Sequence, residues 1–349
     1  MISSDDIGAL AQDMTNRFVG LLWSEADMRK LISELGWQWT GEPGGPAGAV
    51  TGLPGGDAVL IPVGPAEREW APLEEYLELV VPLSHPAPDP RAQAEEFRRA
   101  ADAVRHVLGD ATYAGSHGST GPYGRREGSP LWGSPFMRWR KERVTLELRA
   151  GAAGPELVLQ PSEAWELWYA LGGRGFVGVL EDSGAPLEHP RWELAGDWDY
   201  LEASIGAFLR TLPAETVATG MSQNLSLYGR VGGAAPIMFD IICDDRLYLG
   251  YCEYMVEEAA RGENAAKLGW TRRELLPPGH IRPGDDGKPP WRIDAGGPGE
   301  VRASEMATLI VRTAQAAGVT KATDLIIGGE GEYRRPYKLH FAELLMATG

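Results

Sequence analysis

The segment GSHGSTGPYGRREGSPLWGSP, from Gly115 to Pro135, holds the residue types in this chain that are most able to do chemistry. It combines six glycines and four serines with His117 and the adjacent Arg125 and Arg126. Such a segment could wrap a phosphate, supply a nucleophile with its base, or connect two strands and contact a partner. Each use makes a different demand on the residue spacing and on the flanking elements.

A phosphate-binding loop is the first use to test. The segment lacks the GxxxxGK[ST] spacing and contains no lysine. A phosphate loop also joins a strand to a helix N-terminus, where aligned backbone amides point at the anion. Extended patterns lie on both sides of this loop, so we expect no helix dipole there. The sequence therefore argues against a nucleotide site.

The sequence also argues against two arrangements of a nucleophile with its base. Ser116, His117 and Ser119 are close in sequence on a glycine-rich loop, and no GxSxG elbow is present. Cys243 with His280 could form a thiol enzyme, but Cys243 ends the apolar run IMFDIIC, where a buried structural cysteine is usual. No catalytic residue is predicted. The alternative left open is an enzyme with a site in the cleft between two domains, around His117 or His280.

Metal and cofactor sites are not predicted. The six histidines are scattered, and neither HExxH nor CxxC occurs. The acidic run GDDGKPPWRIDAGG lacks the ligand spacing of a calcium loop.

The same loop holds residue types that gain most at protein interfaces. Tyrosine, tryptophan and arginine are enriched among the residues that dominate binding energy. We therefore expect Tyr123, Arg125, Arg126 and Trp132 to contact a protein partner, in a loop that is mobile until bound.

Capping residues and hydrophobic periodicity predict the elements that must position this loop. One helix is predicted to begin after Ser24 and to end at Gly36, and a second to begin after Asp89 and to end at Gly109. Further helices are predicted at PSEAWELWYALGG with Ser162 as its cap, around residues 201–212, 256–268 and 304–317, and from about residue 339. Strands are predicted at 37–40, 48–53, 58–63, 76–83, 111–114, 135–141, 143–151, 155–160, 224–230, 236–243, 246–254 and 325–327.

Both halves thus begin with an amphipathic helix, continue into an antiparallel meander and return to helix. This order predicts an α+β fold with two domains, 1–196 and 197–349, each an antiparallel sheet packed against helices. Residues 172–197 are expected to be an irregular linker, and 277–299 a proline-rich loop. A two-residue turn at Asp244-Asp245 would place Cys252 opposite Ile237, which leaves no disulfide between Cys243 and Cys252.

Composition narrows the function classes. The chain has 349 residues, with 33 basic against 49 acidic side chains and a net charge of −16. This charge argues against nucleic acid and anionic membranes as partners. The N-terminus is acidic, and no run approaches the ~18 apolar residues of a membrane helix. With two cysteines only, a cytoplasmic protein is expected.

The C-terminal part carries a family resemblance. The marks are LGW after a helix, a proline-rich loop with a tryptophan (PPWRIDA), the helix LIVRTAQAAGV and the following DL run. Over roughly residues 199–330 they resemble the TY-Chap proteins, the type III secretion chaperone-like and YbjN-like domains of actinobacteria. The N-terminal half, with GSPFMRWRKERVTLELR, looks like uncharacterised domains of the same bacteria.

The resemblance implies helices packed on an antiparallel sheet, and a role as a chaperone or immunity-like partner in secretion and toxin systems. We therefore predict a non-enzymatic protein that binds a protein client, an effector or toxin. The identity of the client is open, and a homodimer is an open alternative for the assembly.

Overall fold

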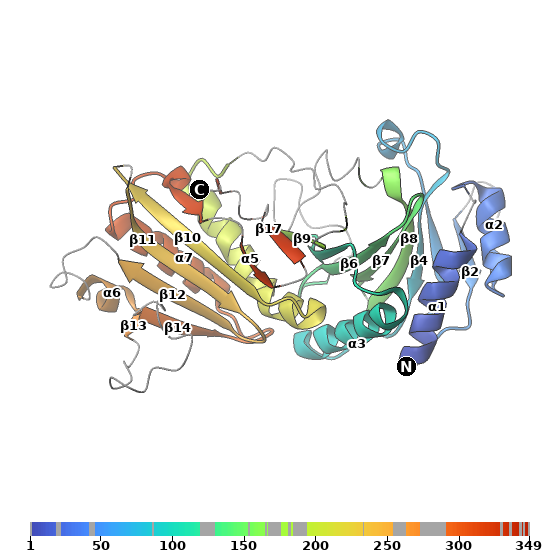
Figure 1. The fold of residues 1–349 in the computed structure, drawn as a ribbon, viewed down its shortest axis with the longest axis horizontal. Helices are drawn as coiled ribbons and strands as arrows, with labels where there is room; N and C mark the ends of the chain where they lie inside the picture. The colour runs from blue at the N-terminus through green and yellow to red at the C-terminus, as the bar shows by residue number, and fades with distance from the viewer. Residues whose placement is uncertain are drawn as a thin grey trace.

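The computed structural model describes the chain in segments. These are residues 2–18, 22–41, 46–85, 87–118, 130–152, 154–164, 166, 176–180, 183, 194–232, 234–253, 263–272, 291–328, 331–334, 337–341, 344 and 346–347. They form two antiparallel sheets with helices packed against them (Figure 1). The predicted α+β class is confirmed.

The first sheet has eleven strands among the described residues, all paired antiparallel. In spatial order they are β1 (Gln38–Thr40), β2 (Ala47–Val50), β3 (Ala58–Pro62), β4 (Tyr76–Pro82), β8 (Pro155–Pro161), β7 (Val144–Ala150), β6 (Pro135–Arg140), β5 (Tyr113–Ser116), β9 (Phe176–Leu180), β17 (Tyr337–Phe341) and β16 (Gly331–Arg334).

The second sheet has six described strands, also antiparallel. Their order is β13 (Thr271–Arg272), β14 (Trp291–Gly296), β12 (Leu247–Glu253), β11 (Ala234–Cys243), β10 (Gln223–Val231) and β15 (Leu325–Ile327).

The described helices are α1 (Ser4–Arg17), α2 (Glu25–Glu34), α3 (Pro90–Leu108), α5 (Trp198–Thr219), α6 (Glu263–Leu268) and α7 (Ala303–Ala316), with 3-10 turns η1 (Glu67–Glu69) and η2 (Ala322–Asp324). In Figure 1, α1, α2 and α3 accompany the first sheet, and α6 and α7 the second. Among the described residues, none of these helices combines the length and the apolar character that crossing a membrane requires.

Local chemistry explains the predicted helix ends. The Asp89 carboxylate accepts a hydrogen bond from Ala92 N–H (2.9 Å), Pro90 occupies the first turn, and Gly109 ends α3 with φ +79°. These are the N-cap and stop residues that the sequence predicts. Phe97 and Val104 of the predicted stripe are fully buried.

Helix α1 is absent from the sequence-based prediction. Ser3 caps it by accepting from Asp6 N–H (3.1 Å), and Ile7, Ala11 and Met14 are fully buried at helical spacing. The apolar stripe is short, so its periodicity alone does not predict a helix. Packing against α3 buries the apolar side of α1 and thereby stabilises this helix.

Helix α5 lies in the middle of the molecule, between the two sheets (Figure 1). Asp197 caps it, and Gly220 ends it in the left-handed conformation with φ +71°. Fifteen of its 22 residues are buried, on all sides of the helix. A helix that is apolar all round must be enclosed by other elements. It packs on α3 and on α7, and Phe208 meets Phe341 of β17 edge to face at 5.8 Å.

Several predicted boundaries are wrong. Residues 337–341 form β17 rather than the start of a helix, because they pair with β9 along its whole length. Strand β9 itself lies in the predicted irregular linker, and β14 occupies the end of the predicted loop 277–299. All three are short segments whose strand character comes from partners far away in the sequence. Of the predicted helix 256–268, the described part is α6.

The hairpin β11–β12 also differs in register. Cys243 pairs with Leu247 and Met238 with Cys252, so the turn holds three residues instead of two. Both cysteines are free thiols.

The domain division at residue 196 stays a prediction. Residues up to 180 lie in the first sheet, and residues 223–327 form the second. The chain then returns, since β16 and β17 pair into the first sheet next to β9. The two sheets therefore do not follow a single cut in the sequence.

The burial of α5 gives a first testable prediction. We expect Phe208→Ala to lower the free energy of unfolding by about 3–5 kcal/mol, because it removes a fully buried ring and leaves a cavity. Urea unfolding followed by tryptophan fluorescence measures this.

Leu131→Ala is the matched control. Leu131 is 81% exposed, so its truncation should change stability by less than about 0.5 kcal/mol. Equal losses in the two variants would contradict the central position of α5.

Candidate functional site

The Gly115–Pro135 loop joins two neighbouring strands. β5 pairs antiparallel with β6, with Ser116 opposite Pro135. This confirms that the loop connects one strand to the next. Its central part, residues 119–129 with Tyr123, Arg125 and Arg126, lies outside the described residues. Their partner-binding role stays a prediction.

Trp132 is the one predicted contact residue that the structure describes. Its side chain is half-buried and packs against the main hydrophobic core, while the neighbouring Leu131 is exposed. Replacing Trp132 would therefore affect packing as well as any interface. Trp132 and the predicted residues of 119–129 are not brought together within the described part of the chain.

The N-terminal end of the loop is anchored by His117. Its backbone N–H donates to Ser134 O (2.9 Å), which continues the β5–β6 pairing by one step. Its ring Nε2 lies 3.1 Å from Glu147 Oε1, and the ring packs on Phe136 with centroids 4.7 Å apart. His117 therefore ties the loop to the middle of the first sheet.

Glu147 is the centre of a buried polar cluster on β6, β7 and β8. Besides His117, its carboxylate accepts from Arg138 Nε and from Gln160 Nε2 (3.2 Å) at Oε2. Arg138 stands directly opposite on β6 and also covers the Phe136 ring at 4.4 Å. Glu147 and Gln160 are fully buried.

The electrostatics follow from these contacts. Burial alone would raise the pKa of Glu147, but the charges of Arg138 and His117 outweigh it and hold this pKa well below its usual range. The carboxylate is therefore ionised, and three donors already occupy its two oxygens. A carboxylate in this state is a poor general base.

A second ion cluster lies beside the first. Arg149 of β7 contacts Glu78 Oε2 at 2.9 Å and Glu156 Oε2 at 3.2 Å. The three side chains project from β4, β7 and β8, which are neighbours in the sheet. Together the two clusters cover the buried sheet face opposite α1 and α3 with paired charges.

The third buried carboxylate, Glu215, comes from α5. Its Oε1 accepts from Ser116 Oγ (2.6 Å) and from Ser134 N–H (2.9 Å), and Ser116 Oγ in turn accepts from Gly118 N–H (3.1 Å). Glu215 thus contacts both ends of the loop. A Cβ at Gly133 would lie 2.7 Å from Glu215 Cγ, so glycine is required for this close approach.

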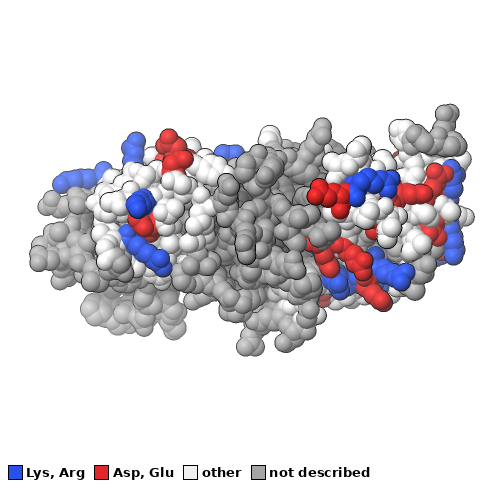
Figure 2. Space-filling view, turned by 90° about the horizontal axis from the view of Figure 1, so that it is seen from above, with Lys and Arg blue, Asp and Glu red and all other residues white. Residues whose placement is uncertain are grey.

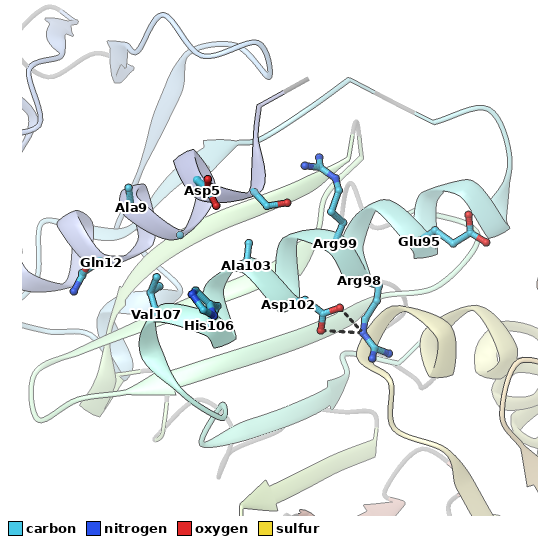
Figure 3. A pocket seen from close by; sticks show the side chains of 12 residues that line it. Asp5, Ala9, Gln12, Glu95, Arg98, Arg99, Asp102, Ala103, His106 and Val107 are labelled. Carbon is cyan, nitrogen blue, oxygen red and sulfur yellow. Dashed lines mark hydrogen bonds and ion pairs between the residues drawn. The ribbon is translucent and has the colours of Figure 1, made fainter.

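A surface groove of about 700 Å³ lies between α1 and α3 (Figure 3). Small side chains form its floor: Gly8, Ala9, Ala103 and Val107. The helices touch along this line, since a Cβ at Gly8 would lie 3.1 Å from Ala103 O and from Val107.

Charged side chains form the rim of the groove. Arg98 Nε donates to both oxygens of Asp102 at 3.1 Å, as Figure 3 shows. The Arg98 guanidinium also reaches the C-terminal end of α5, where a Cβ at Gly220 would overlap it. A cation in this position is favoured by the helix dipole. Asp5, Glu95 and His106 complete the rim.

Thiol and metal chemistry find little support in the described part of the chain. Burial raises the pKa of Cys243 to about 12, which makes its thiolate inaccessible at neutral pH. His280 lies outside the described residues. The described residues hold no group of three or more His, Cys, Asp or Glu side chains arranged to bind a metal ion.

The sequence analysis missed Glu147, Arg138 and Glu215. The alternation in VTLELRA places Glu147 on the face opposite Leu146 and Leu148, which normally indicates solvent. A second signal was available: Phe136 and Val158 lie on that same face, so it is not uniformly polar.

No protein-family model matches this chain, and neither does any curated protein or solved structure in the comparisons. The resemblance of residues 199–330 to the TY-Chap domains therefore stays a prediction.

The Glu147 cluster gives a prediction on pH dependence. A carboxylate whose pKa is lowered by folding stabilises the protein above its unfolded pKa, about 4.3, and this contribution is lost as the pH falls through the folded pKa. We expect Glu147→Gln to cost about 3–5 kcal/mol near neutral pH, because Arg138 loses its charge partner. The difference from wild type should shrink in acid.

Urea unfolding at a series of pH values measures this difference. Glu142→Gln, on the exposed β6–β7 turn, is the matched control and should follow wild type throughout. A constant difference between Glu147→Gln and wild type down to the acid limb would show that the Glu147 charge does not stabilise the fold.

Proposed function

We propose that this chain is a non-enzymatic protein-binding protein of the chaperone or immunity-like class, with a protein client. One observation carries the proposal: the buried ionised cluster and the open groove are separate. His117, Glu147 and Arg138 lie on one face of the first sheet, whereas the groove lies between α1 and α3 on the other side. An active site normally joins a cavity to groups with shifted pKa values.

The dimensions of the groove suit a helical segment of a client. On α3 its lining runs from Glu95 to Val107, about 18 Å at the rise of an α-helix, which is about three turns. Gly8 and Ala103 let α1 and α3 approach each other closely, and the exposed Ala9 leaves room above this contact for a client backbone. An amphipathic helix would place its apolar face on this floor and its polar residues at the charged rim.

An enzyme with His117 as base is the second candidate. The 3.1 Å contact between His117 Nε2 and Glu147 is the arrangement in which a carboxylate orients a histidine. Protein binding is favoured over this enzyme because Glu147 also accepts hydrogen bonds from Arg138 and Gln160. A cytoplasmic location is part of the proposal, and the two free thiols are consistent with it.

The groove gives a prediction on partner capture. Ala9 is exposed on the groove floor, so Ala9→Arg fills the groove without entering the core. We expect the tagged variant to retain less than about a tenth of the client that wild type captures from a lysate of the source organism, measured by quantitative mass spectrometry, since steric exclusion at an interface centre costs about 1.4 kcal/mol or more.

Ala316→Arg is the matched control, because Ala316 is an exposed alanine at the end of α7. It should capture as wild type does, with both variants melting at the wild-type temperature. If Ala9→Arg captures the same proteins in the same amounts as wild type, the groove is not the client site. Loss of a measured turnover in His117→Ala would favour the enzyme instead.

A further inference from the structure

The outer end of the first sheet exposes an unusual share of the large apolar side chains. We define this outer end as residues 22–41 and 46–76, which include α2, β1, β2, β3 and η1 at the right of Figure 1. Seven large hydrophobic side chains are exposed in the described part of the chain, and five belong to the outer end. These five are Leu22, Val50, Val59, Ile61 and Leu73.

Three of these five lie close in sequence to one junction of the backbone. Glu75 N–H donates to Trp23 O (3.0 Å), and Val63 N–H donates to Glu75 O (3.0 Å). Leu22, Ile61 and Leu73 each lie within two residues of these bonded positions. Leu73 is 91% exposed and Leu22 61%. Exposed apolar side chains gathered at one end of an otherwise well-packed fold mark an interaction site more often than an isolated exposed leucine does.

The charge of the outer end determines which partner fits. It holds eight acidic and three basic side chains, an excess of five negative charges. Among the described residues only two of the eight acids form ion pairs, Glu25 with Arg29 and Glu34 with Lys30. The other six are Asp27, Asp57, Glu67, Glu69, Glu74 and Glu75.

Backbone groups hold several of these acids in place. Glu75 Oε2 accepts from Glu25 N–H (2.6 Å), Asp27 Oδ2 from Leu22 N–H (3.0 Å), and Glu74 Oε2 from Leu73 N–H (3.1 Å). Amide donors position a carboxylate but leave its charge uncompensated. Asp27 and Glu74 are therefore fixed beside Leu22 and Leu73, and Glu75 is fixed at the first residue of α2. On the face that Figure 2 shows, acidic and basic side chains of the described residues lie side by side.

We propose that the outer end is a docking surface for a partner segment that combines basic residues with large apolar ones. Leu22, Ile61 and Leu73 supply the apolar contact, and the carboxylates next to them, Asp27, Glu74 and Glu75, select Lys or Arg in the partner. The negative charge disfavours a second copy of this chain, which would bring like charges together. The inference rests on the proposed binding function but not on the groove between α1 and α3.

The probe is a fluorescently labelled peptide of alternating leucine and lysine, about twelve residues long. Its fluorescence anisotropy is measured while the full chain is added. We expect this peptide to bind at least tenfold more tightly than a serine–lysine peptide and a leucine–glutamate peptide of equal length. Binding should weaken in about 1 M salt, where the Debye length falls to about 3 Å.

The double variant Leu22→Ser/Leu73→Ser should bind the leucine–lysine peptide at least tenfold more weakly, and Glu69→Lys/Glu74→Lys should do the same. Leu131→Ser is the matched control, since Leu131 is equally exposed but lies outside the outer end. Both test sites are at the surface, and circular dichroism with melting temperatures checks that each variant is folded.

Equal affinity of wild type and Leu22→Ser/Leu73→Ser would overturn the inference, as would an equal loss in Leu131→Ser. A change in oligomeric state in the Leu22→Ser/Leu73→Ser variant without peptide binding would overturn it in favour of self-association. Ala9→Arg should leave peptide binding unchanged. If Ala9→Arg loses the client while the peptide fails to bind wild type, the docking surface fails and the proposed function stands.

Discussion

The arrangement of the two sheets depends on one buried contact, in which Glu215 of α5 accepts hydrogen bonds from Ser116 Oγ and Ser134 N–H. Helix α5 is apolar almost all round, and apolar packing by itself permits several rotations and shifts of such a helix. A buried carboxylate is costly unless donors meet it, so the helix must present Glu215 to the loop ends. Phe208 then meets Phe341, and the opposite side of α5 receives the second sheet. A polar contact thus specifies the geometry that the hydrophobic core stabilises.

The same reasoning applies to the first sheet. Its face opposite α1 and α3 is buried, yet it carries Glu147 with Arg138 and Arg149 with Glu78. Such pairs add little net stability, because desolvation offsets most of the Coulomb attraction. These pairs instead fix the register of the strands, because a shift of β7 by one residue would move Glu147 to the helix side and leave Arg138 without this partner. The cluster is therefore better explained as a device that fixes strand alignment than as catalytic machinery.

The sequence predicts those features whose causes are local. Caps at Ser24 and Asp89 and alternation in β7 identify their elements, since the responsible atoms lie within a few residues. Strands β9, β14 and β17 were missed because distant partners decide their conformation. Two acids of the interior, Glu147 and Glu215, were missed for a related reason. A charged residue in a strand or helix is expected to be solvent-exposed unless its partner on another element is known, and neither Arg138 nor Ser116 is a sequence neighbour of the acid that it contacts.

The distribution of charge connects the interior with the proposed function. Inside, each described cluster pairs its acids with bases or with hydrogen-bond donors, as low dielectric requires. The net charge of −16 must therefore be carried largely by the surface, and the outer end holds six acids that form no ion pair among the described residues. Uncompensated surface charge slightly destabilises a compact state through self-repulsion. Binding a partner of opposite charge removes this repulsion, so the charge favours such a partner. Fixed carboxylates next to exposed leucines would attract such a partner from a distance and then retain it by apolar contact, whereas catalysis would require the charges to converge on a cavity.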